Sequence, residues 1–144
     1  MGTWDHGPFD NDTAADWCGD MNDADLAKWP ELVEEALRAA VDETGYLDRD
    51  IADRAVAAAA VVAAIQPNAT PVDSVYAPEA LTGSELPTLP GELVPLARRA
   101  LVRVIAEDSE WRDLWEDAGT FPEALAVIDD LRADLQGDTG GAAG

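Results

Sequence analysis

The sequence predicts an all-α protein: a single compact, bundle-like domain of five to six helices with a long proline-rich crossover loop. Apolar residues recur at the three- and four-residue spacing of helices along most of the chain. No stretch alternates in the way that is typical of strands, and 144 residues are enough for one buried core. We expect residues 1–136 to form the domain and the glycine-rich residues 137–144 to be a disordered tail.

Three helices are expected before residue 66. A short amphipathic helix follows the first turn of the chain, with apolar side chains at i, i+3, i+4 and i+7 counted from Ala14. The second starts at Trp29-Pro30, where the missing N–H of proline costs no hydrogen bond, and stops at Gly45. The third, roughly residues 48–66, becomes alanine-rich and apolar on every side, so we place it at the centre of the bundle.

Residues 66–91 contain five prolines and form the predicted crossover loop. Loops longer than about 15 residues without structure of their own are uncommon in compact domains. We therefore expect an ordered crossover rather than a free linker. Whether it is a lid, a dimer contact or filler stays open.

Three more helices are expected after this loop. The fourth covers roughly residues 92–108. The fifth is capped by Ser109 and ended by Gly119, and the sixth starts with Thr120 and Glu123 at capping-box spacing. The expected buried side chains of the last two helices are Trp111, Leu114, Trp115 and Ala118, followed by Leu125, Ile128, Leu131 and Leu135.

The net charge of the chain limits the classes of partner that it can bind. It carries 30 acidic and 9 basic residues, a net charge of −21, which repels nucleic-acid phosphates and anionic lipids. We expect no direct nucleic-acid binding and no membrane association, since the longest apolar run, residues 55–65, is shorter than the roughly 20 residues of a membrane span. Cys18 is the only cysteine, and with no signal peptide we expect a cytoplasmic protein.

The N-terminal stretch "GPFDND" is the one motif that suggests a site. Asp10 and Asp12 have the spacing of an aspartate-nucleophile phosphatase motif, but the residues before them cannot form the required strand. They also have the spacing of the first two EF-hand ligands, but Ala14 and Ala15 stand where an oxygen ligand and a glycine are needed. We assign no metal, cofactor or catalytic residue. The residues kept as a structural turn or a binding site are Trp4, Gly7, Pro8, Phe9, Asp10, Asn11 and Asp12.

With "GTW" and "GPFDNDTAADW" the N-terminus resembles the start of a bacterial protein family known as the domain of unknown function 4259. "SEWRDLWEDAG" and "LRADL" are similar to the C-terminal region of that family. The resemblance covers most of the chain except the tail and implies no known activity, cofactor or substrate. Asp5 and His6 stand where the family pattern favours smaller residues, which speaks against a catalytic His6.

Arginines gather on the fourth predicted helix, at Arg98, Arg99 and Arg103. They could contact an anionic ligand. In so acidic a chain we favour internal ion pairs, such as Arg103 with Glu107 at i, i+4.

Negative charge without catalytic machinery predicts a non-enzymatic protein–protein interaction module that binds a basic partner. An immunity or antitoxin-type neutraliser, or a mimic of DNA charge, are specific forms of it. One alternative is a small-molecule or metal-binding protein or enzyme that uses the Asp10/Asp12 turn, and another is acidity as adaptation to saline conditions. The oligomeric state stays open. The expected contact face is the outer side of the second helix: Glu31, Glu34, Glu35 and Asp42.

Overall fold

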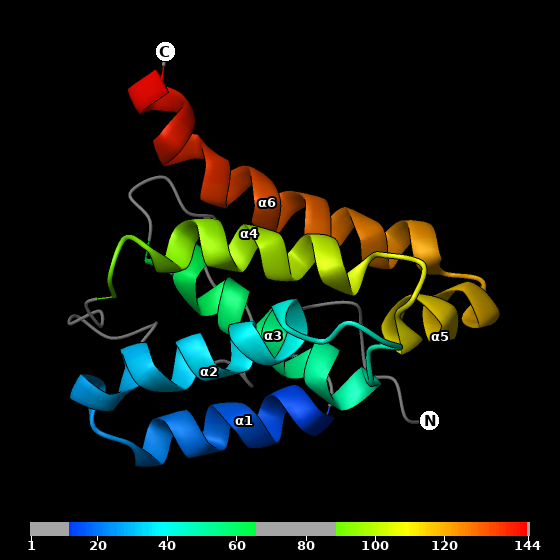
Figure 1. The fold of residues 1–144 in the computed structure, drawn as a ribbon, viewed down its shortest axis with the longest axis horizontal. Coiled ribbons are helices and arrows are strands. Elements are labelled where there is room, and N and C mark those ends of the chain that lie inside the picture. Colours follow the sequence, from blue (N-terminus) through cyan, green and yellow to red (C-terminus); the bar gives the residue numbers. More distant parts are fainter. Residues whose placement is uncertain (1–11, 66–88, 144) are drawn as a thin grey trace.

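The computed structural model describes residues 12–65 and 89–143, and within these ranges every regular element is a helix (Figure 1). The predicted all-α, bundle-like fold is confirmed. Residues 1–11 and most of the predicted crossover loop, residues 66–88, lie outside the described ranges. The helices are α1 (Asp12–Asp23), the short 3-10 helix η1 (Leu26–Lys28), α2 (Trp29–Val41), α3 (Arg49–Ala64), α4 (Leu93–Val104), α5 (Glu110–Ala118) and α6 (Phe121–Ala143).

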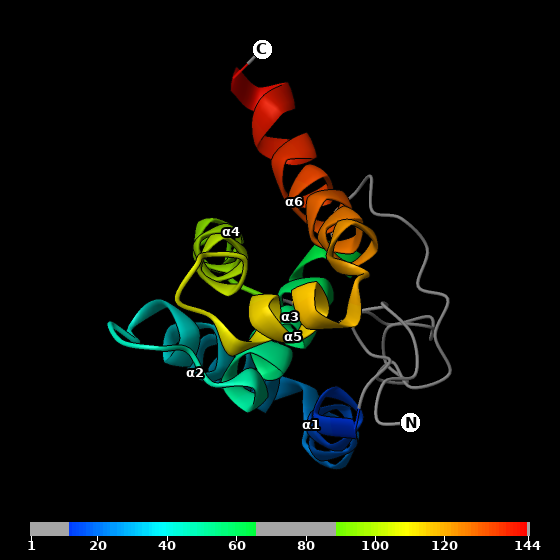
Figure 2. The same cartoon turned by 90° about the vertical axis from the view of Figure 1, so that its right-hand side faces the viewer.

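Helix α3 lies at the centre of the bundle, as the sequence predicts (Figure 2). It contacts α1, α2, α4, α5 and α6, and its side chains are buried almost without interruption from Ala52 to Ala63. Alanine dominates this stretch, and its small side chain lets neighbouring helices approach closely on several sides at once. The alanine-rich composition therefore decides which helix is central.

The other helices pack around α3. Helices α2 and α4 pack on α3 and on each other, and α6 covers α3 and α4. Helix α1 packs mainly on α3 and makes fewer contacts with α2. The end of α1 is tied to the start of α2 by the buried Trp29, whose indole Nε1 donates a hydrogen bond to the Met21 carbonyl at 3.1 Å.

Two helices end earlier than predicted. Helix α2 ends at Val41 rather than at Gly45, and α4 ends at Val104 rather than near residue 108. The two segments that follow meet in a short parallel bridge, where Leu47 N–H donates to the Asp108 carbonyl at 2.8 Å and its own carbonyl accepts from Glu110 N–H at 2.9 Å. Extended backbone is needed there, so the helices must stop before it.

The helix caps are partly as predicted. Gly119 ends α5 with a φ of 79°, a left-handed conformation that only glycine adopts readily. Ser109 precedes α5, but its buried hydroxyl makes no hydrogen bond within the described residues. The hydroxyl of Thr120 is likewise unpaired, so the predicted capping box is absent. Both helix starts are held by packing and backbone hydrogen bonds instead.

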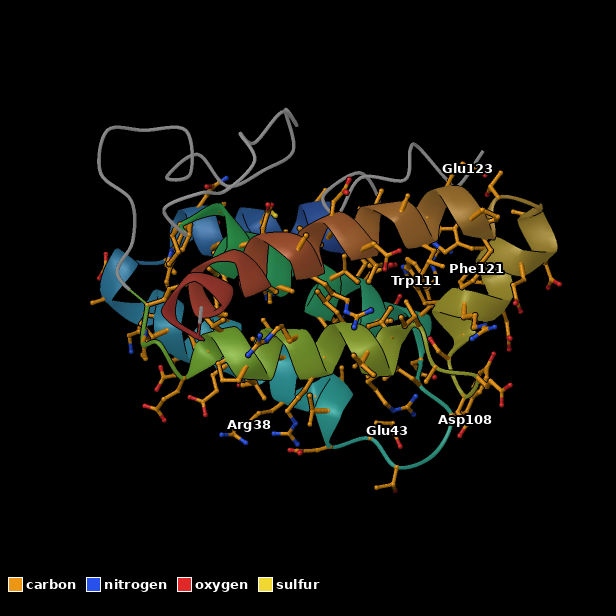
Figure 3. The ribbon with its side chains drawn as sticks, turned by 90° about the horizontal axis from the view of Figure 1, so that it is seen from above. Arg38, Glu43, Asp108, Trp111, Phe121 and Glu123 are labelled. Atoms are coloured by element: carbon orange, nitrogen blue, oxygen red, sulfur yellow. The ribbon has the colours of Figure 1, made fainter. Side chains whose placement is uncertain are left out.

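The predicted apolar face of α5 is only partly buried. Trp111 is 6% exposed and Trp115 is half-buried, whereas Leu114 is 38% exposed and Ala118 is also exposed. Trp111 lies 6.2 Å from Trp115 and 6.5 Å from Phe121 between ring centres, both edge-on. Figure 3 shows Trp111 and Phe121 close together. Helix α5 is nine residues long and packs mainly on α3 and α6. The side chains of its last turn are therefore left exposed.

Helix α6 buries Ile128, Leu131 and Leu135 as predicted, while Leu125 is half-buried. The helix continues to Ala143 and projects beyond the bundle (Figure 1), where the sequence predicts a disordered tail from residue 137. A helix already nucleated by packed residues gains one backbone hydrogen bond for each residue added, without a new nucleation cost. No helix in the described residues combines the length and the apolar content needed to cross a membrane.

Candidate functional site

The predicted N-terminal site cannot be placed. Helix α1 begins at Asp12. Asp12 is therefore part of the helix. The remaining residues of the "GPFDND" turn stay a prediction because they lie outside the described residues: Trp4, Gly7, Pro8, Phe9, Asp10 and Asn11.

The predicted acidic face of α2 is an outward ridge. Glu31, Glu35 and Asp42 are exposed and form no ion pair within the described part of the chain. Glu34 is half-buried and accepts a hydrogen bond from Arg38 Nε at 2.7 Å, and Arg38 points outward from α2 (Figure 3). The ridge therefore has three carboxylates without an ion pair among the described residues and one that pairs with Arg38.

Helix α1 adds a second acidic stripe that the sequence analysis missed. Asp16, Asp20 and Asp23 are all exposed and fall at i, i+4 and i+7, on one side of the helix. None of them forms an ion pair with a described residue. Their spacing was the available signal, although it does not say that this stripe faces the same region as the ridge of α2.

A hollow of about 310 Å³ lies between α1, α2 and α3. It exists because α1 and α2 each pack on α3 but not closely on each other. Its floor is apolar, and Asp20, Glu35 and Arg54 bring charged groups to it from three helices. We call this the α1–α2 groove; its lining residues are Trp17, Asp20, Met21, Leu32, Glu35, Ala36, Ala39, Ile51 and Arg54.

A second hollow, of about 210 Å³, lies between α2 and the start of α4. Arg38 and Arg99 line it together with Glu34 and Glu92. These opposite charges balance, so the hollow favours neither an anionic nor a cationic ligand. The predicted anion contact of the α4 arginines gains no support from it.

The i, i+4 spacing predicts an ion pair between Arg103 and Glu107, but Arg103 donates hydrogen bonds to backbone carbonyls instead. Its Nε donates to the Glu43 carbonyl at 3.1 Å and its Nη1 to the Asp108 carbonyl at 3.2 Å. Its Nη2 donates to the carbonyl of Gly45. One guanidinium thus joins the loop after α2 to the loop after α4.

A buried carboxylate lies near this junction. Asp53 on α3 is 3% exposed and accepts a hydrogen bond from Arg49 Nε at 3.2 Å. The Arg49 backbone N–H in turn donates to Glu110 Oε1 of α5 at 2.8 Å. Burial raises the pKa of Asp53 to about 6, against the opposing effect of Arg49. The arrangement has one cation for two acids and holds no candidate nucleophile, so we assign it a structural role.

We expect Asp53→Asn to raise the free energy of unfolding by about 2 kcal/mol at pH 7.5. The folded pKa of Asp53 lies above its unfolded value of 3.8, so the folded state holds the proton more tightly and ionisation destabilises it. That destabilisation is absent below about pH 4, develops between pH 4 and pH 6, and is constant above pH 6. An amide can still accept the hydrogen bond from Arg49, although the ion pair is lost.

Urea unfolding of both proteins at pH 7.5 and pH 4 measures this effect. The difference between them should vanish at pH 4. Asp130→Asn, at an exposed position of α6, serves as the control and should change stability by less than about 0.5 kcal/mol at either pH. Equal stability of the wild type and Asp53→Asn at pH 7.5 would contradict an ionisation penalty at Asp53.

The remaining candidates for chemistry are not assembled in the described residues. Cys18 is 1% exposed, and burial raises the pKa of its thiol to about 12, so little reactive thiolate is present at neutral pH. Residues 12–65 and 89–143 contain no group of three or more His, Cys, Asp or Glu side chains that could hold a metal ion. His6 lies outside these ranges.

Comparisons with known proteins bear on the family and not on the activity. The sequence model of a protein family described as "Domain of unknown function (DUF4259)" matches residues 2–126. The match includes the N-terminal turn and α1 to α5, and it stops before "LRADL". No curated protein and no solved structure matches the chain. The match covers far more than half of the 144 residues, and the chain therefore belongs to the DUF4259 family.

Proposed function

We propose that this protein is a non-enzymatic interaction module that binds a basic protein through the acidic surface of α1 and α2. The observation that carries the proposal is the set of exposed carboxylates on these helices that have no ion-pair partner in the described residues. We call them the acidic surface: Asp16, Asp20 and Asp23 of α1, and Glu31, Glu35 and Asp42 of α2 and its C-cap.

Charge that is neutralised inside a protein contributes little to the attraction of a partner. Arg38, Arg49, Arg112 and Arg132 each pair with an acid on their own helix, and Arg103 holds carbonyls. None of these arginines forms an ion pair with the acidic surface. Even with Arg54 beside Asp20 and Glu35, the acidic surface keeps an excess of negative charge. Its field extends about one Debye length into solvent, roughly 8 Å at physiological ionic strength, and favours association with a positively charged surface.

The same charge makes nucleic acid and anionic membranes poor partners, because their phosphates would be repelled. A basic protein gains attraction and an increased association rate. An immunity or antitoxin-type neutraliser of a basic toxin, or a mimic of DNA charge, would use such a surface. The single, buried Cys18 suits the reducing cytoplasm, in which we place this protein.

Affinity capture from the native host tests this function. We expect the wild type to retain one basic protein at both low and moderate salt. A variant with Glu31→Gln, Glu35→Gln and Asp42→Asn should lose it, with at least a tenfold drop in affinity for the purified partner. Each charge at a contact contributes a fraction of this change, and three together remove most of the local attraction.

The control carries the same change of net charge elsewhere. Asp117→Asn, Glu123→Gln and Asp130→Asn neutralise three exposed acids on α5 and α6, and this variant should retain the partner like the wild type. Equal loss in both variants would mean that only the overall charge matters. A partner retained by both, or no retained protein, would contradict the proposal.

The alternative function at the Asp10/Asp12 turn has a separate test. Calcium, magnesium or manganese is added while the melting temperature is followed, because a ligand that binds only the folded state raises it. A saturable rise that Asp10→Asn abolishes would favour the metal site over the interaction module. Under the proposed function we expect no saturable rise.

A further inference from the structure

The α1–α2 groove combines two properties that are rarely found together on an acidic surface. Its floor holds the apolar side chains of Trp17, Met21, Leu32 and Ile51 from three different helices. Asp20 on the α1 wall and Glu35 on the α2 wall flank this floor. Both carboxylates belong to the acidic surface, and they outnumber the one basic side chain in the lining, Arg54.

We propose that the groove takes the apolar face of a basic amphipathic helix from the partner protein. This inference rests on the proposed function and names the kind of segment that the acidic surface recognises. One or two apolar side chains of that helix fill the hollow, and flanking lysine or arginine side chains meet Asp20 and Glu35. Recognition is thereby part hydrophobic and part electrostatic, in place of a purely electrostatic attraction between surfaces.

The shape of the groove suits a helix. Its α2 wall is formed at i, i+3, i+4 and i+7 by Leu32, Glu35, Ala36 and Ala39, which is about two turns of one helix face. A groove between two helices that is lined over this length is the usual seat for an amphipathic helix with apolar residues three or four apart. Its volume of about 310 Å³ is near the lower limit for small-molecule pockets, roughly 300 Å³, which suits a few inserted side chains.

The charges around the groove favour an amphipathic segment over a uniformly basic one. Arg54, the only basic residue in the lining, comes from α3, whose Ile51 forms part of the floor. It is exposed and forms no ion pair with a described residue. A lysine or arginine directed at the floor would be repelled by Arg54, whereas an apolar side chain would not. Cations therefore belong on the flanks of the bound segment, beside Asp20 and Glu35.

Two synthetic peptides separate the apolar contribution from the charge. Both are about four helical turns long and carry the same lysines and arginines; one has two leucines four residues apart on the face between them, and the other has alanines there. Fluorescence anisotropy of the labelled peptides measures their affinity for the full chain. We expect the leucine peptide to bind at least tenfold tighter, because burial of its additional methyl and methylene groups in the groove favours it.

Variants of the protein place this preference at the groove. Ala39 is exposed and lines the groove, so Ala39→Trp fills it without altering the charge, and we expect the two peptides then to bind equally. Ala133→Trp adds the same side chain at an exposed position of α6 and should leave the tenfold preference intact. Thermal unfolding of both variants checks that each remains folded.

The outcomes separate this inference from the proposed function. If both peptides bind the wild type equally and lose affinity when Glu31, Glu35 and Asp42 are neutralised, the groove is overturned and the acidic surface stands. If neither peptide binds but the captured basic protein does, the groove is likewise overturned and the acidic surface stands. If neither peptide binds and capture retains no basic protein, both proposals fail. Competition by a peptide of residues 1–11, or a dimer in sedimentation that Ala39→Trp dissociates, would overturn the inference by assigning the groove to this chain or to a second copy.

Discussion

Replacing Ala58 with leucine is expected to lower the free energy of unfolding by about 3 kcal/mol. Ala58 is fully buried in the middle of α3, where alanines on neighbouring positions let several helices approach the same backbone. A leucine at this position adds three carbons to a close-packed interior, and neighbouring helices must move or accept a strained rotamer. The loss falls at the upper end of typical overpacking effects because α3 contacts five other helices.

Chemical denaturation of the purified variant measures this loss. Ala133→Leu, on the exposed side of α6, is the control for the intrinsic effect of leucine in a helix, and it should change the free energy of unfolding by less than about 0.5 kcal/mol. A loss below about 1 kcal/mol at Ala58 would mean that space remains around α3. The central position of this helix would then not depend on small side chains.

Arg103→Ala is expected to cost about 3 kcal/mol, an unusually large effect for a residue that is not fully buried. Its guanidinium donates to the carbonyls of Glu43, Gly45 and Asp108, and a hydrogen bond from a charged donor contributes more than a neutral one. Without it, the carbonyls of Glu43 and Gly45 lose this donor. The two loops keep the backbone hydrogen bonds of Leu47 but lose the side chain that joins them. Two of the three hydrogen bonds are exposed to solvent, which weakens them. The expected loss of stability is therefore that of one or two strong hydrogen bonds rather than three.

Denaturant unfolding of three variants resolves the cause. Arg103→Lys keeps the charge but cannot span three carbonyls, so it should recover less than half of the loss. Arg99→Ala, on the same helix, removes an exposed arginine that makes no hydrogen bond to a described residue, and it should stay within about 0.5 kcal/mol of the wild type. If Arg103→Lys were as stable as the wild type, the stabilisation by Arg103 would come from its charge and not from the several N–H donors of its guanidinium.

The acidic surface and the α1–α2 groove differ in how much of each can be predicted from the sequence. The ridge of α2 was predictable, because Glu31, Glu35 and Asp42 follow from helical spacing once the buried stripe of α2 is known. The stripe of α1 has an equally regular spacing, but spacing within one helix says nothing about which helix lies beside it. The α1–α2 groove exists only because α1 and α2 both pack on α3 and leave a gap between them.

The sequence by itself determined the helical fold, the approximate helix positions and the identity of the central helix. These follow from local periodicity, from Pro30 and Gly119 at helix ends, and from the alanines of α3, all of which act within a few residues along the chain. Only the tertiary structure decided where α2 and α4 end, that Arg103 holds carbonyls and not Glu107, and that a hollow opens between α1 and α2. Each of these depends on groups far apart in sequence, such as Leu47 and Ser109, and contacts of that kind leave no periodic signal in the chain.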